Sequence, residues 1–235
     1  MTEKHISSRF DADLRDVSNR VLEMGGLAES QVVLAMRSLA HMDGEEAAHV
    51  LLQEERVNQM EVEIDGALQR IIAMRQPAAV DLRLLIAVSK AIVNLERVGD
   101  EAARIARTVQ RLIDTGVSSR LRMPAADLSH ESDLAIAQLR RSLDAFARLD
   151  AVQALEVLKH DDQIDQEFDG LLRKLITYMM EDPRTISSSL DLVFVAKAIE
   201  RVGDHAKNLA EATIYVVKGT DVRHHTVADV ENVVR

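Results

Sequence analysis

The sequence contains no cysteine, which excludes disulfide bonds and thiolate metal sites and is compatible with a reducing cytosol. Charged side chains interrupt the N-terminal segment MTEKHISSRFDADLRD, so we expect no secretory signal peptide. No stretch approaches the roughly 18 apolar residues that a membrane span requires. Even the run from Leu82 to Val93 contains Arg83 and Lys90. We therefore expect a cytoplasmic protein without direct membrane insertion.

Proline, glycine and aromatic residues are scarce: the 235 residues include 3 prolines, 9 glycines and 3% aromatics. Residues that favour turns and strands are thus few, which predicts an all-α fold. Basic residues are also in the minority, 29 against 39 acidic residues, and the net charge is −10. A protein that binds duplex nucleic acid normally carries a basic stripe, so this balance argues against a nucleic-acid partner.

Apolar residues recur with helical periodicity through almost the whole chain. The pattern predicts six long helices, over Ser8–Ala40, Glu45–Met74, Asp81–Asp114, Ala125–Leu149, Ala151–Met180 and Ser187–Lys218. The paired glycines Gly25 and Gly26 predict a kink in the first helix, since each weakens a helix by about 1 kcal/mol relative to alanine.

Short turns between long helices predict two antiparallel three-helix bundles related by pseudo-symmetry. We expect the first bundle over residues 1–116 and the second over residues 117–219, with a linker at Ser118 to Pro124. Residues 220–235 form a C-terminal tail with a weak amphipathic pattern.

One pentapeptide occurs twice, as Glu96-Arg97-Val98-Gly99-Asp100 and again as Glu200 to Asp204, 104 residues later (200 − 96). A repeat of this kind indicates an internal duplication. Within each copy the glutamate and the aspartate are four residues apart, which places both carboxylates on one helix face.

Facing positions on the neighbouring helix follow from the antiparallel hairpin, in which residues equally distant from the turn lie opposite one another. With Pro77 as the first turn, Glu96 and Asp100 are predicted to face Asn58 and Glu54. Glu61 and Asp65 have the same spacing but lie about seven residues nearer the turn, roughly 10 Å along the helix, and are ranked lower.

The second hairpin, with its turn at Pro183, predicts that Asp161 and Asp165 face Glu200 and Asp204. This half is acidic at all four positions, whereas Asn58 weakens the first. We therefore expect the second half to be the stronger metal site.

Clustered carboxylates repel one another and raise one another's pKa unless something neutralises them. Hard cations with oxygen ligands are one solution, and the lack of cysteine ligands fits it. The alternative, surface ion pairs with Arg97, Arg201 and other bases, stays open at this point. Gly99 and Gly203 can serve helix packing alone, because glycine inside a long helix often marks a close contact.

Other signals are weaker. The Glu46 to His49 spacing matches one half of a di-iron motif, but only one copy occurs. His205, beside Asp204, and the pair His224-His225 are read as surface histidines. The sequence contains no glycine-rich phosphate loop, nucleophile elbow or zinc-protease motif, and hence no catalytic constellation.

Both copies of the repeat, in LERVGDEAARIA and IERVGDHAKNLAE, resemble the repeated signature of the PhoU family. So do RQPAAVDLRLLIAVSKAI before the first copy, DDQIDQEFDGLLRKLITYMMEDPRTI before the second and IYVVKGTDVRH after it. The resemblance covers essentially the whole chain. It implies two pseudo-symmetric three-helix bundles, a homodimer and no enzymatic activity.

The resemblance also implies a role. PhoU-like proteins are negative regulators of phosphate-starvation signalling that connect the Pst phosphate ABC transporter, through its nucleotide-binding subunit, to the phosphate-sensing histidine kinase. Their acidic motifs bind divalent or iron-type metal ions. By position, the implied metal ligands are Glu96, Asp100, Glu200, Asp204, Asp161, Asp165, Glu54 and Asn58, of which Asn58 departs from the acidic pattern.

Two other functions are compatible with the same residues. A metal-carboxylate bundle enzyme or a metal-storage protein would need histidine ligands or an open metal position, and the facing positions supply neither histidine nor cysteine. A purely structural scaffold would carry the acids as solvated faces only. The leading hypothesis remains a signalling adaptor whose acidic faces dock on basic partner surfaces.

Overall fold

The computed structural model describes residues 8–116 and 125–235, and every regular element in these two stretches is helical. The predicted all-α fold is confirmed. The elements are α1 (Ser8–His41), α2 (Gly44–Arg75), α3 (Ala79–Asp114), α4 (Ala125–Arg148), α5 (Ala151–Lys159), α6 (Asp161–Glu181), η2 (Pro183–Thr185), α7 (Ile186–Lys218) and α8 (Val227–Val234). The predicted linker, Ser118 to Pro124, lies outside the described residues.

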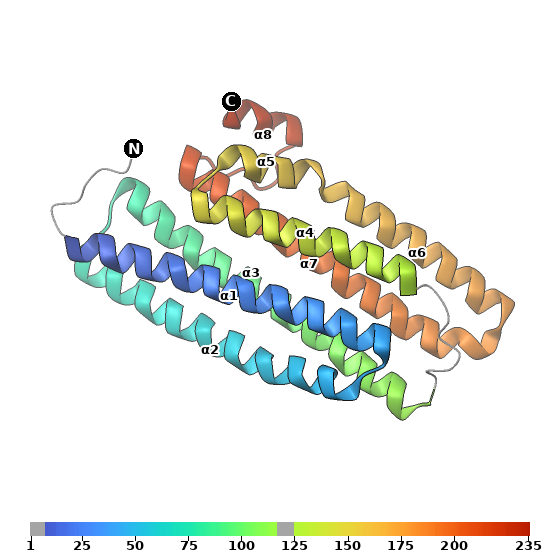
Figure 1. Ribbon diagram of the computed structural model, residues 1–235. Helices are drawn as coiled ribbons and strands as arrows, with labels where there is room; N and C mark the ends of the chain where they lie inside the picture. Colours follow the sequence, from blue (N-terminus) through green and yellow to red (C-terminus); the bar gives the residue numbers. More distant parts are fainter. Residues whose placement is uncertain (1–7, 117–124) are drawn as a thin grey trace.

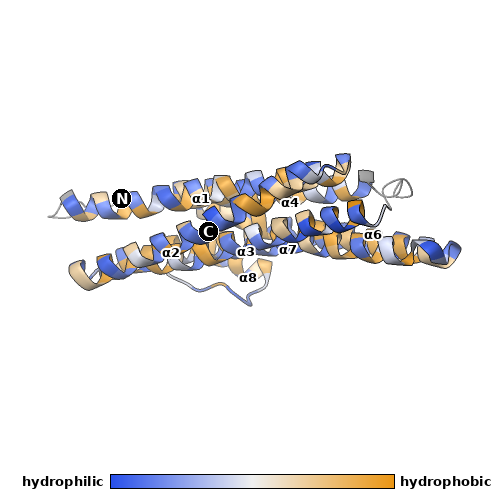
Figure 2. Cartoon of the chain, turned by 90° about the horizontal axis from the view of Figure 1, so that it is seen from below, coloured by the Kyte–Doolittle hydropathy of each residue, from blue (hydrophilic) through white to orange (hydrophobic). Residues whose placement is uncertain are grey.

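The helices form two layers, as Figures 1 and 2 show. One layer has the order α2, α3, α7, α6, with α3 packed on α7 at its centre, and α1 and α4 cover it from one side. Contacts along α3 and α7 show that the two run antiparallel: Asn94 meets His205, and Arg111 meets Asp191 further along. The two halves therefore join along their central helices.

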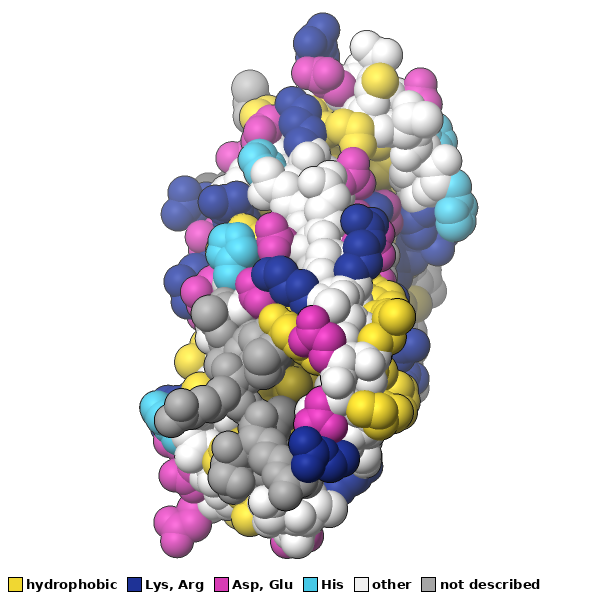
Figure 3. Space-filling view, turned by 90° about the vertical axis from the view of Figure 1, so that its right-hand side faces the viewer, with side chains coloured by type: hydrophobic (Ala, Val, Ile, Leu, Met, Phe, Trp, Pro, Cys, Tyr) yellow, Lys and Arg dark blue, Asp and Glu magenta, His cyan; other side chains and the backbone are white. Residues whose placement is uncertain are grey.

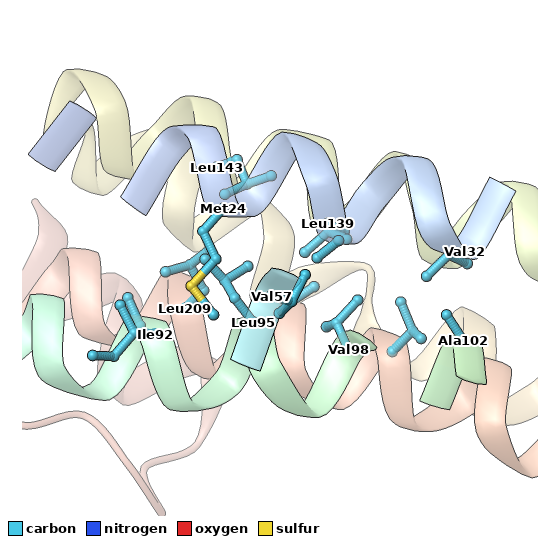
Figure 4. Packing of buried hydrophobic residues seen from close by; sticks show 14 of the residues in the cluster. Met24, Val32, Val57, Ile92, Leu95, Val98, Ala102, Leu139, Leu143 and Leu209 are labelled. Atoms are coloured by element: carbon cyan, nitrogen blue, oxygen red, sulfur yellow. The ribbon is translucent and has the colours of Figure 1, made fainter. Parts of the chain in front are cut away.

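The larger of two hydrophobic clusters among the described residues runs through both halves. Figure 4 shows Met24 from α1 beside Leu143 from α4, above Leu95 from α3 and Leu209 from α7. Because the two halves share this core, the division at residue 116 into separate bundles remains a prediction.

The predicted tail carries a helix of its own. Thr226 caps α8 in a capping box with Asp229. Val230 and Val234 of this helix pack into a second hydrophobic cluster with residues of α5 and α7. Lys218 donates a hydrogen bond to the Val234 carbonyl oxygen at 2.6 Å.

The predicted single helix over Ala151–Met180 is wrong, because the chain breaks at His160 into α5 and α6. The His160 backbone (φ −100°, ψ 0°) departs from the ideal helical angles of about −63° and −42°, and its ring Nδ1 lies 2.7 Å from the Glu156 carbonyl oxygen. The break makes Asp161 the first residue of α6, with its side chain buried.

Gly25 and Gly26 have a different role from the predicted kink, since α1 continues through both. A Cβ atom on Gly25 would come within 3.0 Å of Leu143 Cδ1, whereas one on Gly26 would meet nothing within 4 Å. Gly25 therefore allows α4 to approach α1 closely.

Equivalent positions of the two halves differ by 107 residues in one part of the repeat and by 104 in another. The turns after α1 and α4 match at 107 residues (150 − 43): Asp43 and Asp150 cap the next helix in the same way, and each follows a residue with positive φ. The facing residues Val57 and Ile164 have the same offset (164 − 57). The pentapeptides in α3 and α7 are 104 apart, so three residues are lost in the turn before α7.

Candidate functional site

Each pentapeptide lies in the middle of its helix, and its glycine permits a neighbouring helix to come close. A Cβ atom on Gly203 would lie 2.7 Å from Ile164 Cδ1 of α6. A Cβ atom on Gly99 would lie 3.4 Å from Val57 Cγ1 of α2 and 3.1 Å from Gln31 Oε1. These approaches bring the carboxylates of α3 and α7 against those of α2 and α6.

In the first half, burial, the charge of Asp100 and smaller contributions from Glu61 and Glu54 raise the pKa of Glu96, while Arg97 acts in the opposite direction. Glu54 forms an ion pair with Arg107, whose Nη2 lies 2.8 Å from Glu54 Oε2.

Two residues of α2 differ from the expectation: the predicted facing residue Asn58 and the lower-ranked Glu61. Asn58 is exposed. Glu61 belongs to the acidic group, because burial and the charges of Asp65 and Asp100 raise its pKa against the opposing charge of Arg97. The low ranking of Glu61 rested on a helix register that differs from the observed one.

The error comes from the helix register. Since Val57 faces Gly99, the position opposite Glu96 is near residue 60, one residue from Glu61. The mirror through Pro77 gave residue 58 instead. An error of two residues turns a helix face by about 200°.

In the second half, the four predicted acids lie near enough for their charges to act on one another. Burial and the charges of Glu200, Asp161 and Asp165 raise the pKa of Asp204, opposed by Lys197. Asp161 is buried and accepts hydrogen bonds from Gln138 Nε2 at 3.1 Å and Lys207 Nζ at 2.5 Å.

Asp165 belongs to the same group. Burial and the charges of Asp161 and Glu200 raise its pKa, while Lys207 opposes them. Asp161, Asp162 and Asp165 each offer a carboxylate oxygen within 4.8 Å of the others, a spacing that suits the shell of one cation.

Glu131 of α4 is an acid that the sequence analysis missed. It is only 1% exposed, and neither carboxylate oxygen has a hydrogen-bond donor among the described residues. Burial and the charges of Glu200 and Glu167 raise its pKa to about 8. Its position in the apolar stripe of α4, between Leu128 and Ala135, is the sequence signal that could have identified it.

The arginines of the two repeats are used differently. Arg97 contacts both acids of its own repeat, with Nη1 3.2 Å from Asp100 Oδ2. Arg201 instead crosses to α3 and lies 3.2 Å from the buried Glu101. In the second repeat, Lys197 pairs with Glu200.

Between α3, α7 and the C-terminal segment lies a cleft of about 640 Å³, lined by both arginines, His205, His224 and His225. Burial and the charges of Arg97 and Arg201 lower the pKa of His205 to about 4. Its ring Nδ1 lies 3.0 Å from Asn94 Oδ1. Figure 3 shows acidic and basic side chains interspersed on the face that it displays, without a basic stripe.

Glu46 and His49, whose spacing matches half of a di-iron motif, do not form a pair of metal ligands in the structure. Glu46 forms an ion pair with Arg37 at 2.6 Å, and His49 is exposed.

Comparison with known proteins agrees with this architecture. A family model described as PhoU domain matches residues 21–109 and 128–213, one match in each half. The chain belongs to the PhoU family.

Its relatives match over nearly their full length. A Burkholderia protein named phosphate-specific transport system accessory protein PhoU homolog is 50% identical over 224 residues, 95% of each chain. The Escherichia coli K12 phosphate-specific transport system accessory protein PhoU is 43% identical, over 94% of this chain and 90% of its own. Family membership places this chain among accessory proteins of phosphate transport, which are not a known enzyme family.

Solved structures share the fold. The crystal structure of PhoU from Pseudomonas aeruginosa is 44% identical, covers 90% of this chain and 100% of its own, and gives a TM-score of 0.85. The structure of the phosphate transport system regulatory protein PhoU from Streptococcus pneumoniae is 27% identical, with a TM-score of 0.83 over 91% and 99% of the two chains. Within residues 8–116 and 125–235, no helix combines the length and apolar character needed to cross a membrane.

Proposed function

We propose that this PhoU-family protein is a negative regulator of phosphate-starvation signalling and a modulator of phosphate uptake. It acts in the cytoplasm, as a homodimer, as an adaptor between the nucleotide-binding subunit of the Pst transporter and the phosphate-sensing histidine kinase. The observation that carries this proposal is the match to phosphate transport accessory proteins along both halves, at 50% identity over 95% of the chain.

The architecture supports an adaptor. Long helices on one continuous core present extended, stiff surfaces, which can hold two partners at a defined separation. The net charge of −10 favours docking on basic surfaces, and association driven by charge weakens as salt increases.

The proposal includes metal ions as structural or regulatory ligands. In the second half Asp161, Asp165, Glu200 and Asp204 would hold the ion, and Glu200 Oε2 is buried without a hydrogen-bond donor among the described residues. The donor set contains only carboxylates, which suits a hard divalent or iron-type cation.

In the first half, Glu96 and Asp100 would bind with Glu61. The predicted ligand Glu54 is paired with Arg107, and Asn58 is exposed. Metal binding there should accordingly be weaker.

Purified protein, with and without bound metal, tests the adaptor role in binding assays against the Pst nucleotide-binding subunit and the sensory region of the kinase. We expect both to bind, with affinity falling as NaCl rises from 50 to 300 mM. Loss of the gene should activate the response regulator in phosphate-rich medium. If neither partner binds in either high or low phosphate, the adaptor role is wrong.

The metal role is tested separately by elemental analysis of the purified chain and of a variant with Asp161, Asp165, Glu200 and Asp204 replaced by their amides. Unchanged stability and signalling in this variant would support a purely structural role for the acids. Stoichiometric iron together with substrate turnover would support the enzyme instead.

A further inference from the structure

Three acids of the second half lie at the same height along the bundle, one from each of α4, α6 and α7. The pairing of α4 with α6 follows from Lys174 with Asp127 at 2.8 Å and from His130 with Glu167 at 3.9 Å. The pairing of α6 with α7 follows from Lys197, whose Nζ lies 5.3 Å from the centre of the Phe168 ring. At this height the three helices carry Glu131, Glu167 and Glu200.

The first half has a different set at the equivalent positions. With offsets of 107 for α4 and α6 and 104 for α7, the three acids correspond to Met24, Met60 and Glu96. Met24 and Met60 are buried at 0% and 2% exposure. The fold thus accepts an uncharged side chain at the position of Glu131 and does not itself require an acid there.

Glu131 and Glu200 have three buried oxygens that lack a hydrogen-bond donor among the described residues: both oxygens of Glu131 and Oε2 of Glu200. The other oxygen of Glu200 accepts from Lys197 Nζ at 2.5 Å. Buried polar atoms are nearly always satisfied in native proteins, and an unpaired buried carboxylate is costly. Their mutual repulsion, seen in the raised pKa of Glu131, adds to that cost.

We propose that Glu131 and Glu200 together bind one divalent cation on the core side of α4 and α7, and that Glu167 of α6 closes the site toward solvent. The cation would supply the missing partner for the three oxygens. Carboxylate oxygens alone favour a hard cation such as Mn²⁺, Mg²⁺ or Ca²⁺, with water completing the shell. The site uses a helix that the repeated acidic motifs do not involve.

This inference deepens the metal-binding part of the proposed function and shares Glu200 with it. Two other occupants of the space are a proton shared between the two carboxylates and a bound water. Both leave Mn²⁺ binding independent of Glu131, so a metal titration separates them from the proposal.

The test uses the full chain, stripped with a chelator and titrated with MnCl₂ by calorimetry and by electron paramagnetic resonance of free and bound Mn²⁺. Glu131→Met introduces the residue that the first half uses and should fold, as circular dichroism will verify. We expect it to lose one Mn²⁺ per chain or to bind at least tenfold more weakly, with a smaller Mn²⁺-induced rise in Tm. Glu131→Gln should behave similarly.

Two further variants serve as controls for net charge and for the acids of α6. Asp133→Asn removes one negative charge from the exposed face of the same helix and should leave Mn²⁺ binding unchanged. Asp165→Asn tests the acids of α6 independently of α4. If Asp133→Asn weakens binding as much as Glu131→Met does, only net charge matters and the proposed site is wrong.

The experiment distinguishes failure of the Glu131 site from failure of the proposed metal function as a whole. Wild-type stoichiometry and affinity in both Glu131 variants, together with weaker binding in Asp165→Asn, would overturn this inference and leave the proposed metal function standing. If the wild-type chain binds no Mn²⁺, Zn²⁺ or Fe²⁺, both fail.

Discussion

The two halves of the molecule carry different side chains at the same height beside their repeated motifs. Around Glu96 the first half packs Met24 and Met60, which complete a hydrophobic core. Around Glu200 the second half has the buried Glu131 and the half-exposed Glu167, so that an ionisable group enters the interior. A duplicated fold can therefore keep its packing while one half gives up hydrophobic stabilisation for a carboxylate-rich site.

A second asymmetry lies across the α3–α7 contact. Arg201 of the second half pairs with the buried Glu101 of the first. The position equivalent to Glu101, 104 residues on, holds His205, whose pKa the neighbouring Arg97 and Arg201 lower. One side of this contact is an ion pair, and the other keeps a neutral histidine.

The largest expected loss of stability follows from placing a glutamate in the first half at position 24, which is equivalent to Glu131 of the second half. Met24→Glu places a carboxyl group at a fully buried position that Met24 fills. We expect the free energy of unfolding to fall by about 4 kcal/mol in urea denaturation at pH 7, because Met24 lies within the hydrophobic core. A loss below about 1 kcal/mol would show that the two cores are interchangeable.

The next effect concerns the ion pair between the halves. Glu101→Ala should lower the free energy of unfolding by about 2 kcal/mol, because the half-exposed Arg201 and Arg104 both lose the buried carboxylate with which they pair. His205→Ala at the equivalent position should cost about 1 kcal/mol, since it removes one hydrogen bond. Equal losses in the two variants, measured by the same urea titration, would refute this asymmetry.

Glu131→Met should stabilise the chelator-treated protein, by about 2 kcal/mol at pH 8. The native state keeps the Glu131 proton up to about pH 8, whereas the unfolded chain releases it near its ordinary value of 4.5. Wild-type stability therefore falls as pH rises through this window, and the advantage of the variant grows. Urea midpoints at pH 5 and pH 8 measure the difference; a pH-independent advantage would contradict it.

The smallest effect tests how α4 approaches α1. Gly25→Ala should lower the free energy of unfolding by about 1 kcal/mol, because overlap with Leu143 exceeds the gain in helix propensity. Gly26→Ala, in open space, is the control and should raise it by up to about 1 kcal/mol. Thermal unfolding of both variants gives the comparison, and stabilisation by both would show that α4 moves freely.

Most helices could be predicted from the sequence, because apolar periodicity and the glycine and proline stops are local signals. The break at His160 could not, since Ala151 to Met180 is continuously helical in pattern. Its consequence is tertiary: Asp161 begins a new helix where Gln138 and Lys207 can both reach it.

The candidate site was predictable only in part. In the second half the mirror through Pro183 predicted positions within one residue of Asp161 and Asp165, and the charges of these two acids raise the pKa of Asp204. In the first half, the same assumption of a symmetric hairpin favoured Asn58 over Glu61. A register error of two residues is enough to place a side chain on the opposite face of a helix. The hairpin mirror could not find Glu131, because it relates two helices and this acid comes from a third; only its place in the apolar stripe of α4 marked it in the sequence.

Local sequence patterns were enough to establish that the chain is helical, that it is duplicated and that each repeat presents two carboxylates on one helix face. These follow from local spacing, which helix geometry translates directly into direction. Which acids lie near one another, and which are buried without a hydrogen-bond donor among the described residues, became known from the packing of the helices. Those properties depend on the register between helices, and that register is set by close contacts such as Gly203 with Ile164.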